Sequence, residues 1–267
     1  PEPAPAGPER PRRHSQAGDS DGRPAAILSG RAGALGAILA AFLTACAPGY
    51  GTGATLLSQF DWTDDAEDHG GFSAIEVDDG GEHFTALTDR GKIVEGQFSR
   101  GADGHVTGID AGDLRPLVNR VGNVLKERPW PDSEGLSRDS QGRFYVSFEG
   151  RRPKVWRYAA LDGAAHALPR PGKFLALTRN RALESVGVDQ EDRVWTVVED
   201  AEGNAYVTWI FENGAWRSGP SIPTDDGYAA VEIDFDDQGR LYLLERALRG
   251  VLGFQTRIRR FDLPGLQ

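Results

Sequence analysis

The strongest constraint on the fold is a hairpin unit that recurs four times along the chain. Each copy has an apolar strand, a tight turn rich in Asp and Gly, a second strand with an aromatic residue near its start, and then an acidic residue. Turns of this composition tolerate left-handed backbone and favour hairpins. The four units are residues 72–89, 133–149, 183–199 and 229–245.

Further strands follow each hairpin, so that a complete unit holds four strands in about 40 to 50 residues, the blade length of a β-propeller. The added strands are expected at 92–97 with 105–109, at 154–158 with a segment near His166, at 205–211 with 215–218, and at 256–262. A β-sandwich of hairpins is the alternative, but a sandwich has no reason to repeat an acid at one place. The sequence therefore predicts an all-β fold, a β-propeller of four-stranded antiparallel blades, over residues 55–267. Four blades are visible, so either the propeller is small or the sequence is truncated at its C-terminus and lacks one or two blades.

One insertion, residues 108–131, departs from the repeat. Its apolar residues recur with the spacing of a helix face, from Leu114 through Leu117 and Val121 to Leu125, and Pro116 suits a first helical turn. A small helix is expected here.

The N-terminal region reads as an export signal. Residues 1–30, rich in Pro, Gly, Arg and Ser, are expected to be a disordered leader. The uncharged run 32–45 is too short to span a bilayer but suits a signal peptide. Residues 43–46 resemble a bacterial lipobox, which implies lipidation at Cys46 and a signal peptide over 31–46, followed by a linker over 47–54. The alternative is a buried apolar helix with an incidental thiol.

The charge of the chain limits its partners. The net charge is −10 and the chain has one cysteine, so a nucleic-acid partner and internal disulfides are not expected. Cations are the favoured bound ions.

Carboxylates recur at one edge of the hairpins. In an antiparallel hairpin the start of the first strand lies beside the end of the second. Glu134 should therefore adjoin Glu149, and Glu184 should adjoin Glu199, while Asp89 and Glu245 take the corresponding second-strand place. These edges would converge at one mouth of the propeller channel. Carboxylates held together repel unless a cation lies among them, and oxygen ligands favour Ca²⁺ over Mg²⁺.

The expected site thus has candidate catalytic residues Glu134, Glu149, Glu184 and Glu199, and candidate metal ligands Asp89, Glu149, Glu199 and Glu245. Nearby arginines could pair with an anionic substrate, namely Arg90, Arg151, Arg152 and Arg246. The competing interpretation is that each acid caps a turn or pairs with an arginine.

Other chemistries lack their motifs. The sequence contains no GxSxG, HExxH or GxxxxGK[ST] pattern. The four histidines that follow the leader have no ligand spacing and are expected at the surface or in turns; they are His69, His83, His105 and His166.

The order of several short motifs resembles the phytase-like family known as "esterase-like activity of phytase". The resemblance covers nearly all of residues 56–262 and rests on Gly70-Gly71-Phe72-Ser73-Ala74-Ile75-Glu76, Thr88-Asp89-Arg90-Gly91, Asp132-Ser133-Glu134-Gly135-Leu136, Phe148-Glu149-Gly150, Leu183-Glu184-Ser185 and Leu244-Glu245-Arg246. Each motif alone is weak, and their order along the chain is the specific part. The family name implies a hydrolase.

Together these features predict an exported, lipid-anchored, monomeric propeller at the periplasmic face of the outer membrane, which touches the membrane through its lipid alone. It would hydrolyse small anionic phosphate or carboxylic esters with a bound cation. A non-enzymatic binding or assembly propeller of the envelope, and a calcium-dependent sugar lactonase, are the alternatives, since a fold alone does not fix an activity.

Overall fold

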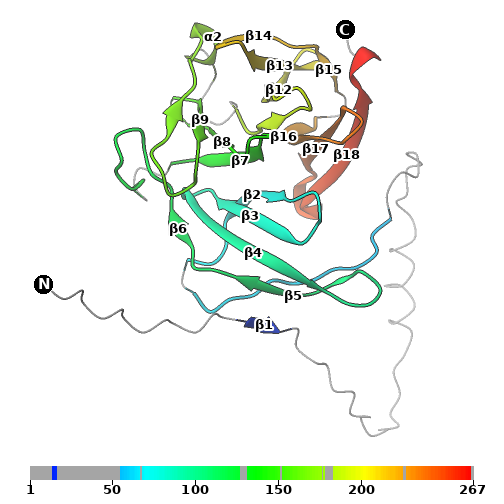
Figure 1. The fold of residues 1–267 in the computed structure, drawn as a ribbon. Coiled ribbons are helices and arrows are strands. Elements are labelled where there is room, and N and C mark those ends of the chain that lie inside the picture. Colours follow the sequence, from blue (N-terminus) through cyan, green and yellow to red (C-terminus); the bar gives the residue numbers. More distant parts are fainter. Residues whose placement is uncertain are drawn as a thin grey trace, which may run out of the picture.

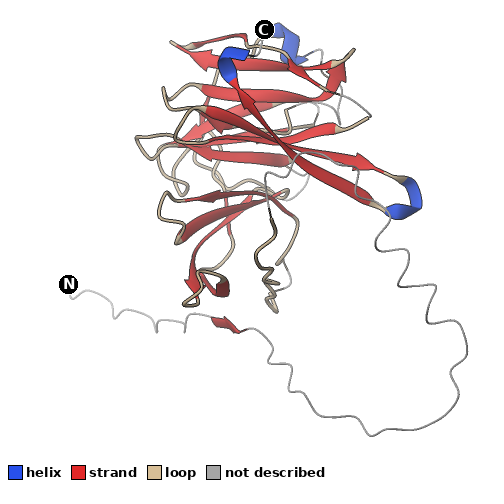
Figure 2. Cartoon of the chain, turned by 90° about the vertical axis from the view of Figure 1, so that its right-hand side faces the viewer, coloured by secondary structure: helices blue, strands red, loops and turns tan. Residues whose placement is uncertain are grey.

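The computed structural model describes residues 14–16, 55–66, 68–126, 131–150, 152–175, 177, 183–224 and 227–265. The signal peptide, Cys46 and the linker fall outside these residues. Within the described part of the chain, no helix has the length and hydropathy needed to cross a bilayer. In the residues that the structure describes, helix is confined to short segments, namely α2 (Gly172–Leu175), η1 (Gly250–Leu252) and η2 (Leu263–Gly265), as Figure 2 shows.

Four antiparallel sheets form the blades of a four-bladed β-propeller and follow one another around a common centre (Figure 1). Blade 1 contains β2 (Phe72–Val77), β3 (His83–Thr88), β4 (Lys92–Arg100) and β5 (Val106–Ala111), with β1 (His14–Gln16) paired to β5 and β6 (Arg115–Pro116) paired to β4. Blade 2 contains β7 (Ser133–Arg138), β8 (Phe144–Phe148), β9 (Lys154–Tyr158) and β10 (His166–Ala167).

Blade 3 contains β11 (Gly187–Val188), β12 (Val194–Glu202), β13 (Ala205–Glu212) and β14 (Ala215–Ser218), with β15 (Ile222–Pro223) paired to β13. Blade 4 has three strands, β16 (Ala229–Phe235), β17 (Arg240–Leu248) and β18 (Phe254–Asp262). The predicted hairpins, strands and propeller are confirmed.

Hydrophobic cores lie between successive blades. One cluster joins blades 1 and 2 through Leu87 and Phe148, a second joins blades 2 and 3, and a third joins blades 3 and 4 through Trp195 and Leu243. The fourth cluster lies on the other face of blade 1, where Phe60 and Trp62 pack against Phe84 and its neighbours. Burial of these side chains supplies most of the driving force for the fold.

A repeated aspartate fixes three of the hairpin turns. Asp139, Asp189 and Asp236 each accept hydrogen bonds from the backbone N–H groups two and four residues later and from the arginine side chain four residues later. Each also accepts a bond from the side chain six residues later, which is Tyr145, Trp195 or Tyr242. The carboxylate therefore ties the turn to the start of the next strand.

The predicted helix in the insertion is wrong, because none of the described residues 108–126 is helical. Arg115 and Pro116 pair with blade 1 as β6, and the N–H of Leu117 donates to the carbonyl of Gly91 at 2.8 Å. Leu117 is fully buried, whereas Val121 is 79% exposed on the loop that follows. The apolar spacing thus reflects extended pairing with β4 and a loop, not one helix face.

Candidate functional site: an acidic mouth

Antiparallel pairing brings the repeated acids to one end of the propeller. Glu134 lies near the start of β7 and Glu149 follows the end of β8, which pairs with β7. Glu184 follows Leu183, which is bridged to Val198 just before Glu199. Edge residues of blades 2 and 3 therefore meet at the channel, and we call this end of the propeller the acidic mouth.

Glycine allows two mouth aspartates to pack against the backbone. Gly71 has a φ of +66° and Gly150 a φ of +79°, a region that L side chains rarely adopt. A Cβ on Gly71 would lie 2.8 Å from Oδ1 of Asp89, and one on Gly150 would lie 2.9 Å from Oδ2 of Asp132. Blades 1 and 2 thus use the same device to hold a carboxylate at the mouth.

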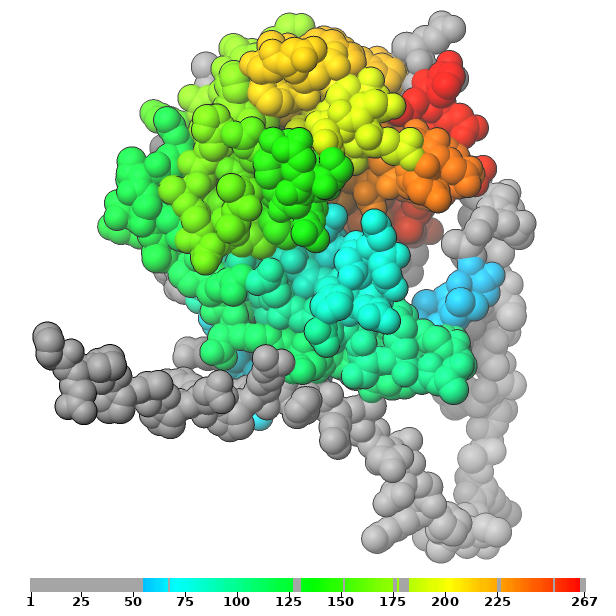
Figure 3. Space-filling view, in the orientation of Figure 1, coloured from blue at the N-terminus to red at the C-terminus, as the bar shows by residue number. Residues whose placement is uncertain are grey.

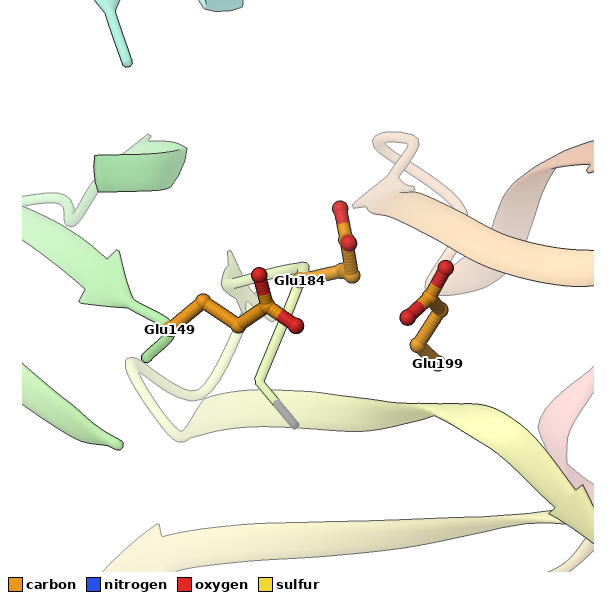
Figure 4. A group of neighbouring side chains, drawn as sticks. All are labelled: Glu149, Glu184 and Glu199. Carbon is orange, nitrogen blue, oxygen red and sulfur yellow. The ribbon is translucent and has the colours of Figure 1, made fainter. Parts of the chain in front are cut away.

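Three of the predicted residues come together closely. Glu149, Glu184 and Glu199 each offer a carboxylate oxygen, and these atoms all lie within 4.8 Å of one another. Figure 4 shows the three side chains approaching from separate segments of the chain. Carboxylate oxygens are the donors that hard cations such as Ca²⁺ and Mg²⁺ take in proteins.

Burial and mutual repulsion both act on these carboxyl groups. Burial, followed by the charges of Glu199, Glu134 and Glu149, raises the pKa of Glu184 to about 8. Burial and the charge of Glu149 raise the pKa of Glu134 to about 7. Such crowding disfavours the ionised forms unless positive charge is supplied. Glu134 thus belongs electrostatically to the same cluster.

Asp89 lies at the rim of the mouth. Its charge raises the pKa of Glu134, so the two groups are close enough to interact. Among the described residues, its buried Oδ1 has no hydrogen-bond donor, and Nε of Arg90 lies 3.8 Å from it. A buried acceptor of this kind is costly unless a ligand satisfies it.

The predicted arginines differ in their placement. Arg246 is exposed, yet its charge lowers the pKa of both Glu134 and Glu184, so it faces the acidic mouth from blade 4. Arg90 sits beside Asp89 at the rim. Arg152 is exposed, and Arg151 lies outside the described residues.

Glu245 does not join the three-carboxylate cluster. Its side chain is fully buried, and its oxygens accept hydrogen bonds from Arg257, Arg259 and Tyr206. Burial opposes the charge of Glu245, but the hydrogen bonds from both arginines outweigh it and hold the pKa below its usual value. The acid of blade 4 therefore serves as the centre of an ion-pair network between β17, β18 and blade 3. Sequence position alone could not show this, because the arginines lie on a strand outside the repeated hairpin.

Two mouth residues were missed by the site prediction. Asp132 precedes Glu134 by two residues, and its charge contributes to the raised pKa of Glu134. Lys154 lies over the rings of Phe148 and Trp156, with Nζ 4.3 Å and 5.1 Å from their centroids. Burial and the charge of Arg170 lower the pKa of Lys154 to about 8. Asp132 belongs to the motif Asp132-Ser133-Glu134-Gly135-Leu136 of the family resemblance, whereas no sequence pattern pointed to Lys154.

The described histidines lie apart from the mouth cluster. His83 contacts Asp78 and Gln97, His105 contacts Asp103, His69 contacts Trp62, and His166 is in β10. A cavity of about 470 Å³ lies at the opposite end of the blades from the mouth, between blades 1 and 2, and its lining includes Glu76, His83 and Arg138. The cavity therefore does not coincide with the carboxylate cluster. We place the candidate site at the mouth because its donors converge there.

The fold and the site define a β-propeller with an acidic mouth suited to a hard cation. The chain belongs to the phytase-like family described as "esterase-like activity of phytase", whose model matches residues 67–267. No curated protein sequence matches it.

Several solved structures are similar over about 71–72% of this chain. They are U3-55K (8% identity, TM-score 0.40, 53% of that chain), a protein of unknown function from Dyadobacter fermentans (13%, 0.38, 66%) and a gluconolactonase from Xanthomonas campestris (14%, 0.39, 61%). The chain thus spans less than two thirds of the length of these proteins.

Proposed function

We propose that the protein is a cation-assisted hydrolase of phosphate or carboxylic esters. The observation that carries this proposal is the approach of the carboxylate oxygens of Glu149, Glu184 and Glu199 to within 4.8 Å of one another. Membership of the phytase-like family supports the hydrolase class.

In this proposal Glu149, Glu184 and Glu199 would hold Ca²⁺. A bound cation would polarise the ester oxygen and lower the pKa of a water molecule. Glu134, at the edge of the cluster, would accept the proton of the attacking water. Arg246 and Arg90 would pair with the negative charge of the substrate and align it over the mouth.

The test is hydrolysis of a panel of phosphate monoesters, carboxylic esters and one sugar lactone, with Ca²⁺ and with a chelator. Calcium-dependent turnover that falls at least a hundredfold in Glu149→Gln supports the proposal. The matched control is Glu191→Gln, because Glu191 is exposed in a hairpin turn, paired with Arg193, and should leave turnover unchanged. Absence of turnover in a folded, calcium-loaded protein would favour the binding module, and turnover of the lactone alone would favour the lactonase.

We also propose that the protein is exported and anchored in the outer membrane by lipid on Cys46, with the propeller in the periplasm. The support is the lipobox-like tetrapeptide Leu43-Thr44-Ala45-Cys46 after an uncharged run. Labelling of the intact chain with a radioactive fatty acid in a bacterial host should occur, and Cys46→Ser should abolish it. Equal labelling of both proteins would contradict the anchor.

A further inference from the structure

The junction between blades 1 and 2 is only partly filled by apolar side chains. At the end nearer the mouth, the hydrophobic cluster that contains Leu87 joins the two blades. The other end holds the cavity of about 470 Å³, which extends from Glu76 of β2 to Asp110 of β5 and has Arg138 of β7 on its opposite wall. A cavity of this size suits a small molecule. In Figure 3 the cyan atoms of blade 1 adjoin the green atoms of blade 2.

One difference in the repeated turn accounts for the cavity. In every blade the N–H of the turn aspartate donates to the carbonyl of a residue at the start of the second strand, which is His83 in blade 1. Two residues further on, the other blades have an aromatic side chain that donates to the aspartate, namely Tyr145, Trp195 and Tyr242. Blade 1 has Thr85 instead, and Thr85 lines the cavity. The space that a ring takes in the other blades is therefore open here.

Two carboxyl groups on the blade 1 wall, those of Glu76 and Asp110, have no ion-pair partner among the described residues. Glu95, a third acid on this wall, is already paired with Arg115. Burial raises the pKa of Glu76 to about 8, with a further contribution from the charge of Asp234. A positive charge placed beside such a carboxyl group stabilises its ionised form. The blade 1 wall therefore favours a cationic group.

The blade 2 wall carries the opposite charge. Arg138 is paired with Phe144 across β7 and β8, and its guanidinium lies over the Phe144 ring, 5.4 Å from the centroid. Stacking on an aromatic face holds a guanidinium in place and leaves its N–H groups free to bind an anion. No carboxylate of the described residues forms an ion pair with Arg138. This wall therefore favours a carboxylate or another oxyanion.

Opposite charges thus face each other across the cavity without pairing. We infer that the cavity binds a small zwitterion, with its ammonium group at the carboxyl groups of Glu76 and Asp110 and its carboxylate at Arg138. The acids of blade 1 would repel a purely anionic ligand and Arg138 a purely cationic one, whereas a molecule with both charges is complementary to both walls. An amino acid or a dipeptide has this chemistry. The site is remote from the mouth and does not depend on the hydrolase proposal.

Calorimetric titration of the full-length protein with L-alanyl-L-alanine tests the choice of ligand. One dipeptide per chain is expected to bind. N-acetylation removes the ammonium charge and amidation removes the carboxylate charge, and each change should weaken binding at least tenfold. L-alanine keeps both charges, and tighter binding of either zwitterion supports the inference. Equal binding of the blocked dipeptides, binding of glucose or ethylamine in preference to both zwitterions, or binding of none of these probes would overturn it.

Substitutions on the two walls should change different preferences. Arg138→Gln should remove the preference for a free carboxylate over an amide, and Asp110→Asn should reduce the preference for a free ammonium group over its acetylated form at least threefold. The matched controls, Arg120→Gln and Asp162→Asn, lie at exposed positions outside the cavity and should change neither preference. Each preference is a ratio measured on one protein, so partial loss of folded protein cannot mimic the result. Preferences that survive in both wall variants would overturn the inference.

Filling the cavity tests its location. Thr85→Tyr introduces the kind of side chain that the other blades have at this position, so the propeller should keep its urea unfolding midpoint. We expect this variant to lose dipeptide binding, whereas Thr85→Ser, which leaves the cavity open, should bind as the wild type does. Both results are independent of Ca²⁺ and of ester hydrolysis, so they stand or fall separately from the proposed function. Dipeptide binding that survives in folded Thr85→Tyr would place the ligand elsewhere and overturn the inference.

Discussion

Glu149 follows β8 and Glu199 lies within β12, the second hairpin strands of neighbouring blades, and a carboxylate oxygen of each lies within 4.8 Å of one of the other. They hold equivalent positions in the repeat, so the ring geometry itself creates the approach. Glu184 joins them from the start of the hairpin of blade 3. Three negative charges at this spacing are unfavourable alone, which makes the cluster a functional candidate with a physical basis.

Neutralising Glu184 should stabilise the cation-free protein. Repulsion from Glu199, Glu134 and Glu149 adds to burial in raising the pKa of Glu184, so Glu184→Gln should raise the free energy of unfolding by about 1–3 kcal/mol at pH 8 in the presence of a chelator. The same variant should lose most of the stabilisation that Ca²⁺ gives the wild type. Urea unfolding with and without Ca²⁺ measures both effects. Destabilisation of the cation-free protein would instead indicate a structural ion pair.

The stability of the wild type should fall as pH rises from about 5 to about 9. Burial and the charge of Asp234 raise the pKa of Glu76 from 4.5 to about 8. Between these values the folded protein holds a proton that the unfolded chain has lost, so unfolding becomes easier as pH increases. Glu76→Gln should flatten this dependence in urea unfolding at pH 5.5, 7 and 8.5. The raised pKa values of Glu134 and Glu184 act in the same direction and leave a residual slope. An unchanged slope in Glu76→Gln would contradict the assignment.

Removing the charge of Glu245 should be strongly destabilising. This fully buried carboxylate balances Arg257 and Arg259, and its loss leaves both guanidinium groups partly buried without their partner. Glu245→Gln should lower the free energy of unfolding by about 3–5 kcal/mol. Glu212→Gln, which breaks the exposed pair with Arg217, is the control and should have little effect. Equal effects of both variants would show that the blade 4 network is not structural.

The hairpin aspartates should be sensitive to amide substitution. In Asp189→Asn one carboxylate oxygen becomes an NH₂ group, which cannot accept a hydrogen bond. In one orientation of the amide this group would face the side-chain donors of Arg193 and Trp195, and in the other it would face backbone N–H groups. We expect a loss of about 1–3 kcal/mol in the free energy of unfolding. Asp237→Asn, an exposed position in the corresponding turn of blade 4, should cost much less. A similar result for both would mean that the carboxylate bonds of Asp189 contribute little.

The parts that could be predicted from the sequence are those controlled by local pattern. Repeated hairpins with alternating apolar residues and Asp–Gly turns predicted the blades, and antiparallel pairing predicted that Glu149, Glu184 and Glu199 would meet. The insertion was mispredicted because pairing of Arg115 and Pro116 with β4 overrides a helix-like apolar spacing.

Contacts distant in sequence were beyond prediction. The network of Glu245 depends on Arg257 and Arg259 of the next strand, and nothing in the local pattern of the hairpin signals it. The position of Lys154 over Phe148 and Trp156 is set by packing between strands.

Calorimetric titration of the full-length protein with Ca²⁺ is the most direct test of the central claim, that the acidic mouth holds a divalent cation. The account predicts one Ca²⁺ per chain in the wild type, at least tenfold weaker binding of Mg²⁺, and loss of the calcium site in Glu149→Gln and in Glu199→Gln but not in Glu191→Gln. No calcium binding by the folded wild type, or calcium binding that survives both mouth substitutions, would contradict it.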